Sequence, residues 1–422
     1  MSQDKSESSR QPGGRTSRRT FLRVAAGTAA MAPALAQAGQ SSSQPAPHRI
    51  LTFVGTYSSP QGPEGSKGRG QGIYVLEMNP TCGVLTQREI IANDANPACL
   101  ALAPSGAHLY SANEVAYFGG ENSGSVSAYS VDRASEHLTL LNTVSSEGAG
   151  PAHLSVHPSG KFVLVANYAG GSMAVLPIHG GGELGPATDV VHNRGALGPE
   201  RPQSAPPGSF AISGHDKPHA HMIQADAAGR FVFAADLGLD RIFIWKFDME
   251  KGKLTPNDPE YAEFPPGDGP RHFAFHPSGR WFYSLQEEGS TLVAFDYDSS
   301  LGKLTEKQSL SSLPKGFVGT NYTSEVMISA DGKFLYAANR LHDSIAWFPI
   351  SATGTLVFGG EEWTRGDYPR SFNIDPTGDF LYCCNQRADA ITTFRVNRQT
   401  GALTFTGHYT PIGTPANIVF LM

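Results

Sequence analysis

Short runs of alternating apolar and polar residues fill the chain from residue 50 onward, and most are rich in Val, Ile, Phe or Tyr. Such runs predict β-strands, because successive side chains of a strand point to opposite faces. Six turn signals separate the runs: Pro104-Ser105-Gly106, Pro158-Ser159-Gly160, Ala227-Ala228-Gly229, Pro277-Ser278-Gly279, Ala330-Asp331-Gly332 and Pro376-Thr377-Gly378. The seventh residue after each glycine is polar, namely Asn113, Asn167, Asp236, Gln286, Asn339 and Asn385. A spacing kept six times indicates an internal repeat.

Each repeat has the content of one propeller blade, with four short strands joined by tight turns in 46 to 69 residues. A seventh copy is divided between the ends of the chain, because residues 51–57 resemble the second strand of a repeat and residues 414–420 resemble the first. We therefore expect an all-β, seven-bladed β-propeller over residues 50–422, with a C-terminal strand that completes blade one and closes the ring. A two-sheet sandwich is the alternative, but it does not explain the repeat.

The N-terminal segment has the pattern of an export signal. Arg18 and Arg19 precede a weakly apolar run over residues 24–36, and small residues follow at Ala34, Ala36 and Ala38. This order predicts a twin-arginine signal peptide over residues 1–38 and a linker over residues 39–49. We expect the mature protein to be periplasmic or otherwise exported. A short membrane anchor is the alternative, although the run is short for a span.

Composition excludes several classes of partner. The formal net charge is −6 and no Lys/Arg-rich face is evident, so we expect no binding to nucleic acid, and none to a membrane after signal cleavage. Four cysteines are too few for a disulfide scaffold in 422 residues, and we expect packed thiols. We expect a monomer.

Polar side chains concentrate at one end of the predicted ring. In a propeller, the loop before the inner strand and the loop between the second and third strands open on the same face. The first set of loops carries Cys99, His153, His221, Arg271, His272, Glu325, Arg370 and Asn417, and the second carries Tyr57, Glu114, Tyr168, Leu237, Glu287, Arg340 and Gln386. We call this face the mouth. A site there would bind a small molecule, with substrate contacts expected from His153, His219, His272, Glu325, Arg370 and Gln386.

The arginines of three consecutive blades, Arg271, Arg340 and Arg370, indicate an anionic ligand, because a guanidinium binds carboxylate or phosphate with two donors. Salt bridges to Glu287, Glu325 or Asp343 are the alternative for each arginine. The Asn and Asp residues at the spacing-seven position are expected to be structural, as are His157 and His276 in the turns.

The pair His219 and His221 invites a metal site, but no Cys or Glu at ligand spacing completes one, so we expect no metal and no cofactor. His221 is the candidate general base, because the pKa of imidazole lies near neutrality. A Gly/Pro/Ser-rich insertion at Gly195–Pro218 is a candidate lid over the mouth, and Tyr57–Gly72 is a candidate rim loop.

Several motifs together resemble the lactonase family of seven-bladed propellers, which includes one form of bacterial 6-phosphogluconolactonase and the fungal carboxymuconate-lactonizing enzymes. The motifs are residues 218–221, 236–241, 269–277, 339–345 and 369–372, and they occur in the family's order. The resemblance extends over residues 50–422. It implies that His221, Glu287, Arg271 and Arg340 carry the chemistry.

These observations predict a carboxylic ester hydrolase that opens an anionic sugar lactone. His221, oriented by Glu287, would activate water, and Arg271 and Arg340 would stabilise the oxyanion. The export signal argues against 6-phosphogluconolactone itself, which is a cytoplasmic metabolite. One alternative is a muconate-type lactonising or cycloisomerase enzyme. Another is a non-catalytic propeller that binds a protein or a cell-wall ligand through exposed aromatic rim residues.

Overall fold

The computed structural model describes residues 50–60, 67–212 and 214–422, which form strands, turns and loops. The predicted signal peptide and linker lie outside these described residues, as do residues 61–66 of the candidate rim loop. No helix in the described ranges is long and apolar enough to cross a membrane.

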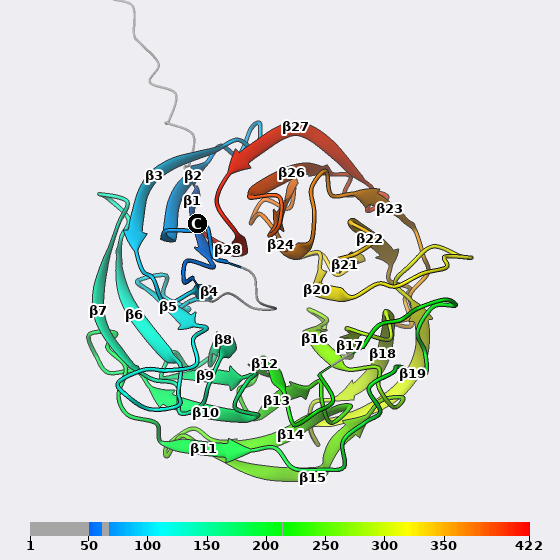
Figure 1. Cartoon of the computed structure of the whole chain (residues 1–422), viewed down its shortest axis with the longest axis horizontal. Helices are drawn as coiled ribbons and strands as arrows, with labels where there is room; N and C mark the ends of the chain where they lie inside the picture. Colours follow the sequence, from blue (N-terminus) through cyan, green and yellow to red (C-terminus); the bar gives the residue numbers. More distant parts are fainter. Residues whose placement is uncertain (1–49, 61–66, 213) are drawn as a thin grey trace, which may run out of the picture. The chain divides into compact units, whose positions relative to one another are not determined.

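The strands form seven four-stranded antiparallel sheets arranged as a ring (Figure 1). The first three blades, from the inner strand outward, are β28 (Pro415–Leu421), β1 (Ile50–Thr56), β2 (Gly72–Met78) and β3 (Leu85–Ala92); then β4 (Pro97–Leu102), β5 (His108–Asn113), β6 (Ser125–Asp132) and β7 (His137–Ser145); then β8 (Pro151–Val156), β9 (Phe162–Asn167), β10 (Ser172–Pro177) and β11 (Asp189–His192).

The other four blades follow in chain order. They are β12 (Ala220–Ala225), β13 (Phe231–Asp236), β14 (Arg241–Asp248) and β15 (Lys253–Glu263); β16 (Pro270–Phe275), β17 (Trp281–Gln286), β18 (Thr291–Asp298) and β19 (Lys303–Ser311); β20 (Thr323–Ile328), β21 (Phe334–Asn339), β22 (Ser344–Pro349) and β23 (Gly360–Trp363); and β24 (Pro369–Ile374), β25 (Phe380–Asn385), β26 (Ala390–Val396) and β27 (Leu403–Pro411). The predicted seven-bladed propeller is confirmed.

The repeat detected in the sequence corresponds to the hairpin between the first two strands of a blade. Each of the six repeated turn glycines has a φ between +68° and +75°, a conformation that glycine adopts without strain. The polar residue seven positions later is the last residue of the second strand in every case. The spacing therefore measures the length of one turn plus one strand.

The blades are held together by apolar packing between neighbours. The described residues contain seven large clusters of buried side chains, and each joins two adjacent sheets. Every residue of β9, β13, β17, β21 and β25 is buried, because a blade covers both faces of these strands. The outer strands, in contrast, expose alternate residues to solvent.

Ring closure follows the prediction. Strand β28 pairs with β1 from Leu51 opposite Leu421 to Thr56 opposite Pro415, so the C-terminus supplies the inner strand of blade one. The side chain of Ile418 packs between blades seven and one, in a cluster with Val54 and Ile391.

The side chains expected to be structural are buried and hydrogen-bonded. The Asn167 amide donates to the Ser146 carbonyl at 2.8 Å, and the Asp236 carboxylate accepts from the His219 backbone at 2.9 Å. His157 Nε2 lies 2.9 Å from the Gly229 carbonyl, and His276 Nε2 lies 2.9 Å from the Gly332 carbonyl. Each of these histidines thus ties its turn to the turn of the next blade, and the predicted role is confirmed.

The four cysteines are free, and three of them, Cys99, Cys383 and Cys384, are buried. The prediction of packed thiols is therefore confirmed for these three. Cys82 is partly exposed.

The insertion after β11 is fastened to blades four to six on the mouth side. His215 Nε2 lies 3.0 Å from the Asp240 carboxylate, and the Ser204 backbone donates to Asp268 at 3.1 Å. The Tyr322 hydroxyl is hydrogen-bonded to both the N–H and the C=O of Ile212, each at 3.0 Å. Buried carboxylates thus anchor the predicted lid segment to the ring.

Replacing Ile418 by Ala should lower the free energy of unfolding by about 2–5 kcal/mol, because the side chain is 1% exposed and its loss opens a cavity at the ring closure. Urea unfolding of the mature protein measures the change. Val357→Ala, at an exposed position, is the control and should change the free energy by less than about 0.5 kcal/mol. Equal effects of the two substitutions would contradict the packing role of β28.

Replacing Asp268 by Asn should change how stability depends on pH. Burial and the nearby Asp240 carboxylate raise the pKa of Asp268 to about 6. Folding therefore favours the protonated acid, and the wild type loses stability as pH rises from about 4 to 6, whereas the Asn variant does not. The variant should gain about 1–2 kcal/mol relative to the wild type between pH 4 and pH 7 in urea unfolding.

Asp94→Asn, in an exposed loop, controls for the loss of one negative charge. If the free energy of unfolding of Asp268→Asn differs from that of the wild type by the same amount at every pH in this range, the protonation of Asp268 is not coupled to folding.

Candidate active site

A β-bulge occurs at the start of the inner strand in every blade. The pairing register shifts after the first residue, so that one residue is left without a partner on the second strand. In six blades the bulged residue is Ala98, Ala152, His221, Arg271, Arg370 or Ala416, and in blade six the shift spans Ser324 and Glu325. Bulges redirect side chains and are common next to active sites. Here three of the seven blades carry a large basic side chain at the bulge.

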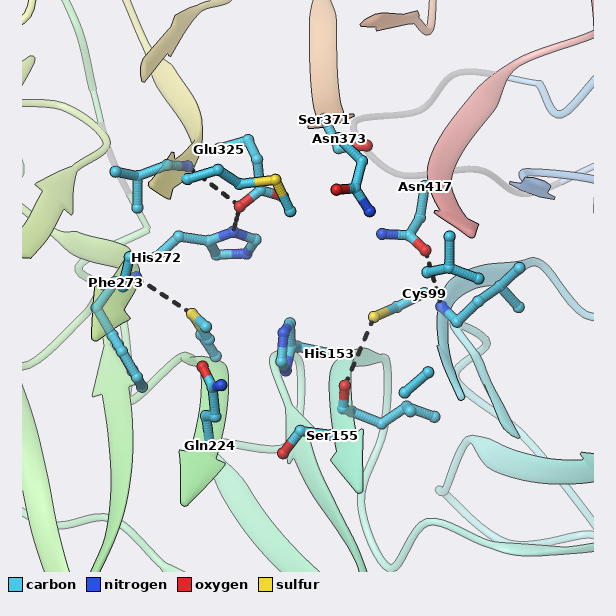
Figure 2. A pocket seen from close by; sticks show the side chains of 18 of the residues that line it. Cys99, His153, Ser155, Gln224, His272, Phe273, Glu325, Ser371, Asn373 and Asn417 are labelled. Atoms are coloured by element: carbon cyan, nitrogen blue, oxygen red, sulfur yellow. Dashed lines mark hydrogen bonds and ion pairs between the residues drawn. The ribbon is translucent and has the colours of Figure 1, made fainter. Parts of the chain in front are cut away.

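The residue after the bulge has a different direction and faces the axis of the ring. Figure 2 shows Cys99, His153, His272, Glu325 and Asn417 pointing into one open space, and Ser371 is also part of the lining. Arg271 and His272 were expected together in one loop at the mouth, and the bulge gives their side chains different directions. A repeated three-residue pattern in the sequence distinguishes the bulged residue from the residue that faces the axis. It occurs as Pro97-Ala98-Cys99, Pro151-Ala152-His153 and Pro270-Arg271-His272.

Glu287 joins the arginines of blades five and six. Its Oε2 atom lies 2.7 Å from Arg271 Nε, and its Oε1 atom lies 2.7 Å from Arg340 Nη2. Both arginine side chains are 2% exposed, whereas the Glu287 side chain is 14% exposed. Arg271 also donates from Nη1 to the Ser324 carbonyl. Burial, and then repulsion from Arg340, lowers the pKa of Arg271 to about 10, although Glu287 opposes the shift.

His221 lies beside this group but is not bonded to Glu287. Its ring meets the rings of Tyr168 and His272 edge to face, at centroid distances of 5.4 Å and 5.1 Å. Its Nδ1 atom is buried with no hydrogen-bond partner among the described residues. The expectation that Glu287 orients His221 is therefore wrong, because both carboxylate oxygens are engaged by arginines. Burial, followed by the positive charge of Arg271, holds the pKa of His221 well below its usual value.

Two tyrosines of the site were not predicted. Arg340 Nη1 lies 3.1 Å from the Tyr368 hydroxyl, and the Arg340 guanidinium is 5.1 Å from the Tyr368 ring and 5.7 Å from the Tyr322 ring. Tyr368 has a φ of +63°, which is rare for a bulky residue, and Asp343 fixes it by accepting from its N–H at 2.8 Å. Each tyrosine immediately precedes an inner strand, so the repeat contained a signal that placed it at the mouth.

Arg370 forms a second group with blades one and two. Its guanidinium lies 4.9 Å from the Tyr57 ring centre and 3.7 Å from Glu114 Oε2, which also accepts from the Tyr57 hydroxyl at 2.7 Å. Tyr57 is fully buried, and burial raises its pKa well above the usual value, with Arg370 opposing the shift. The hydroxyl is therefore a neutral donor.

A cavity of about 540 Å³ runs along the axis of the ring. Its mouth end is lined by Tyr57, His221, Arg271 and Arg370, and the opposite end reaches the turns at Pro277, Ala330 and Pro376. We call this space the axial channel. Glu287 and Arg340 do not line it.

The other predicted contact residues lie in three places. His153, His272 and Glu325 line the axial channel, where His272 Nδ1 is 2.9 Å from Glu325 Oε1. His219 stacks on Tyr168 at a centroid distance of 4.2 Å and bonds Asp216 of the insertion at 2.9 Å. Gln386 is buried and does not line the channel. The structure therefore brings His221, Arg271 and Arg370 together at the channel, with Glu287 and Arg340 behind Arg271.

Two further features bear on the alternatives. Within the described ranges, no group of three or more His, Cys, Asp or Glu side chains could hold a metal ion. Two aromatic side chains in mouth-side loops, Tyr117 and Phe210, are 74% and 72% exposed, which is the kind of residue that a protein-binding rim would use.

Comparison with known proteins confirms the resemblance noted from the motifs. The family described as Lactonase, 7-bladed beta-propeller, matches residues 52–420. A 6-phosphogluconolactonase of Bacillus subtilis is 32% identical over 375 residues, which cover 88% of this chain and 99% of that protein. Another, from Formosa agariphila, is 30% identical over 83% of this chain and 94% of its own length. The solved structure of a Pseudomonas aeruginosa periplasmic gluconolactonase matches with a TM-score of 0.78 at 28% identity, over 89% of this chain and 99% of that one. The chain belongs to the lactonase family of seven-bladed β-propellers.

Proposed function

We propose that this protein hydrolyses a small sugar lactone of anionic type at the mouth end of the axial channel. The observation that carries the proposal is a buried neutral imidazole, His221, beside the buried arginine Arg271 at one wall of a cavity large enough for such a ligand. Family membership supports lactone hydrolysis as the reaction, and the names of two relatives support a sugar lactone as the substrate.

His221 would act as the general base. It takes a proton from a water molecule, and the hydroxide adds to the lactone carbonyl carbon. The ring C–O bond then breaks, and the ring oxygen leaves with the electron pair and receives the proton from His221. A buried imidazole that is neutral at pH 7 is suited to both steps.

The arginines would stabilise the negative charge that develops on the carbonyl oxygen. Arg271 is the nearest candidate, because it lines the cavity beside His221. Glu287 and Arg340 hold Arg271 in place through the shared carboxylate, so their role is to position it. Arg370, on the far side of the channel mouth, is the candidate contact for an acidic or hydroxyl group of the substrate.

Export is part of the proposal. The twin-arginine motif over residues 17–22 supports it, and one structural neighbour is described as periplasmic. A periplasmic enzyme would meet unphosphorylated sugar lactones in preference to 6-phosphogluconolactone.

The purified mature protein should accelerate the opening of a sugar lactone that carries a free carboxylate, such as glucaro-1,4-lactone, measured by base uptake in a pH-stat after subtraction of the spontaneous rate. His221→Ala and Arg271→Ala should each lower kcat/KM by about 10²–10⁴-fold, because they remove the base and the oxyanion stabiliser. His192→Ala and Arg194→Ala, at exposed positions with the same residue types, are the matched controls and should leave the rate unchanged.

Substrates of three kinds separate the proposed function from its alternatives. The panel contains an unphosphorylated sugar lactone, 6-phosphogluconolactone and a muconate with its lactone. Turnover of the muconate alone would establish the lactonising alternative in place of the proposal. Unchanged lactone opening in His221→Ala and Arg271→Ala would refute the assigned site.

The pH profile of kcat/KM should keep its full rate well below pH 6.5. A histidine base works when it is neutral, and burial together with Arg271, His272 and Arg370 lowers the pKa of His221. The acidic limb therefore falls below the usual histidine range. Arg370→Gln removes one of the lowering charges and should move this limb to higher pH by up to about one unit. A wild-type limb at or above pH 6.5 would contradict a buried, neutral His221 as the base.

A further inference from the structure

Lactone hydrolysis leaves a proton that has to be removed from the site. In the proposed function, on which this inference rests, the proton taken from water returns to the ring oxygen. The product is then a carboxylic acid, which ionises at neutral pH and releases one proton per turnover. His221 is the adjacent base and is neutral again at this stage, so it is the first acceptor.

His221 is poorly suited to keep that proton. Its side chain is buried, and Arg271, Arg370 and Arg340 all disfavour the imidazolium form. Its Nδ1 atom has no hydrogen-bond partner in the described part of the chain, so no carboxylate there stabilises the charged ring. The proton therefore needs an onward acceptor.

The nearest side chain with that chemistry is His272. Its ring lies edge to face with the His221 ring at a centroid distance of 5.1 Å and an interplanar angle of 70°. Unlike His221, it has a carboxylate partner, because its Nδ1 atom lies 2.9 Å from Glu325 Oε1. Glu325 is itself held by the Val326 backbone N–H at 3.1 Å.

The bond to Glu325 leaves the other ring nitrogen of His272 available. When Nδ1 donates to the carboxylate, Nε2 of the neutral ring is an acceptor. The charged groups that act on His272 are Glu325 from β20, Arg271 from its own strand and Arg370 from β24, and His221 and His153 are its ring neighbours. Burial lowers the pKa of His272 below its usual value, and Glu325 is the one charged group among them that opposes this shift.

Beyond this pair the axial channel continues to the opposite face of the ring. Ser155, Gln224 and Asn373 project into it in Figure 2, and its lining extends to Asp375 and Pro376 in the turns at the far end. Polar side chains of this kind support a chain of water molecules. The channel is thus a route to solvent that does not pass through the mouth.

We propose that His272 and Glu325 form a proton relay that carries the product proton from His221 into the axial channel. The proton moves from the product carboxyl group to His221 and then, through one water molecule, to His272 Nε2. Glu325 stabilises the resulting imidazolium, and the same proton then leaves Nε2 for water in the channel. No covalent bond to the substrate is involved, and both histidines return to their starting forms.

Glu325→Gln tests the relay because it removes the charge and keeps the shape. We expect kcat to fall at least about tenfold with KM little changed, and the solvent deuterium isotope effect on kcat to rise, because proton removal becomes rate-limiting. His272→Gln should behave in the same way. Added imidazole should restore the rate of both variants in a concentration-dependent manner, because a small base reaches the channel and accepts the proton.

Controls separate the relay from a structural role. His192→Gln and Glu260→Gln make the same two changes at exposed positions on outer strands, and both variants should retain wild-type kcat and isotope effect. Glu325→Asp keeps the carboxylate and should recover much of the activity lost in Glu325→Gln. The melting temperature of every variant is measured in parallel.

Three outcomes would overturn the relay. One is an unchanged kcat and isotope effect in Glu325→Gln and His272→Gln. Another is a raised KM that imidazole does not correct, which would make these residues substrate contacts instead. The third is an increase in rate with added imidazole that is as large in His192→Gln as in His272→Gln, because the added base would then act without the relay. If the wild type opens no lactone in the panel, the proposed function fails first, and the relay fails with it.

Discussion

A four-stranded blade exposes two apolar faces, and only another blade can cover each of them. This constraint determines the rest of the structure. The second strand of a blade is buried on both faces, as in β17 and β21, so a chain of such sheets leaves an uncovered face at each end until the ring closes. Strand β28 completes blade one from the other end of the chain, and the cluster containing Ile418 is the last of the seven interfaces. Because the ring closes, it has an axis, and residues far apart in sequence meet there.

The bulge at each inner strand converts that architecture into a site. The bulge turns Arg271 toward Glu287, while His272 faces the axis. Two adjacent residues of one strand therefore serve two places, the mouth and the channel. Where nothing charged is needed, the same bulge carries alanine, as at Ala98, Ala152 and Ala416.

The sequence was sufficient for the fold because the fold is a repeat. The spacing between Gly279 and Gln286, and its five counterparts, measures a hairpin that every blade shares, and the same register placed Arg340 and Glu287 at one end of the ring. The directions of side chains could not be obtained in this way. They depend on the bulge and on which charged groups pair with one another. Glu287 was expected to contact His221, but it forms ion pairs with Arg271 and Arg340 instead. The repeat places Tyr368 at the mouth, but its contact with Arg340 depends on an exceptional backbone conformation held by Asp343 and could not be predicted.

The arginines that would stabilise the oxyanion also weaken the base beside them. Arg271 and Arg370 lower the pKa of His221, so the abstraction of a proton from water is less favourable than it would be for an isolated imidazole. In the proposed reaction, however, the imidazolium and the oxyanion form in the same step. The positive field that opposes the first stabilises the second, and the two effects largely offset each other in the transition state. The same field makes His221 a stronger acid toward the departing ring oxygen. A buried imidazole among arginines is thus a poor permanent holder of a proton and a good temporary one.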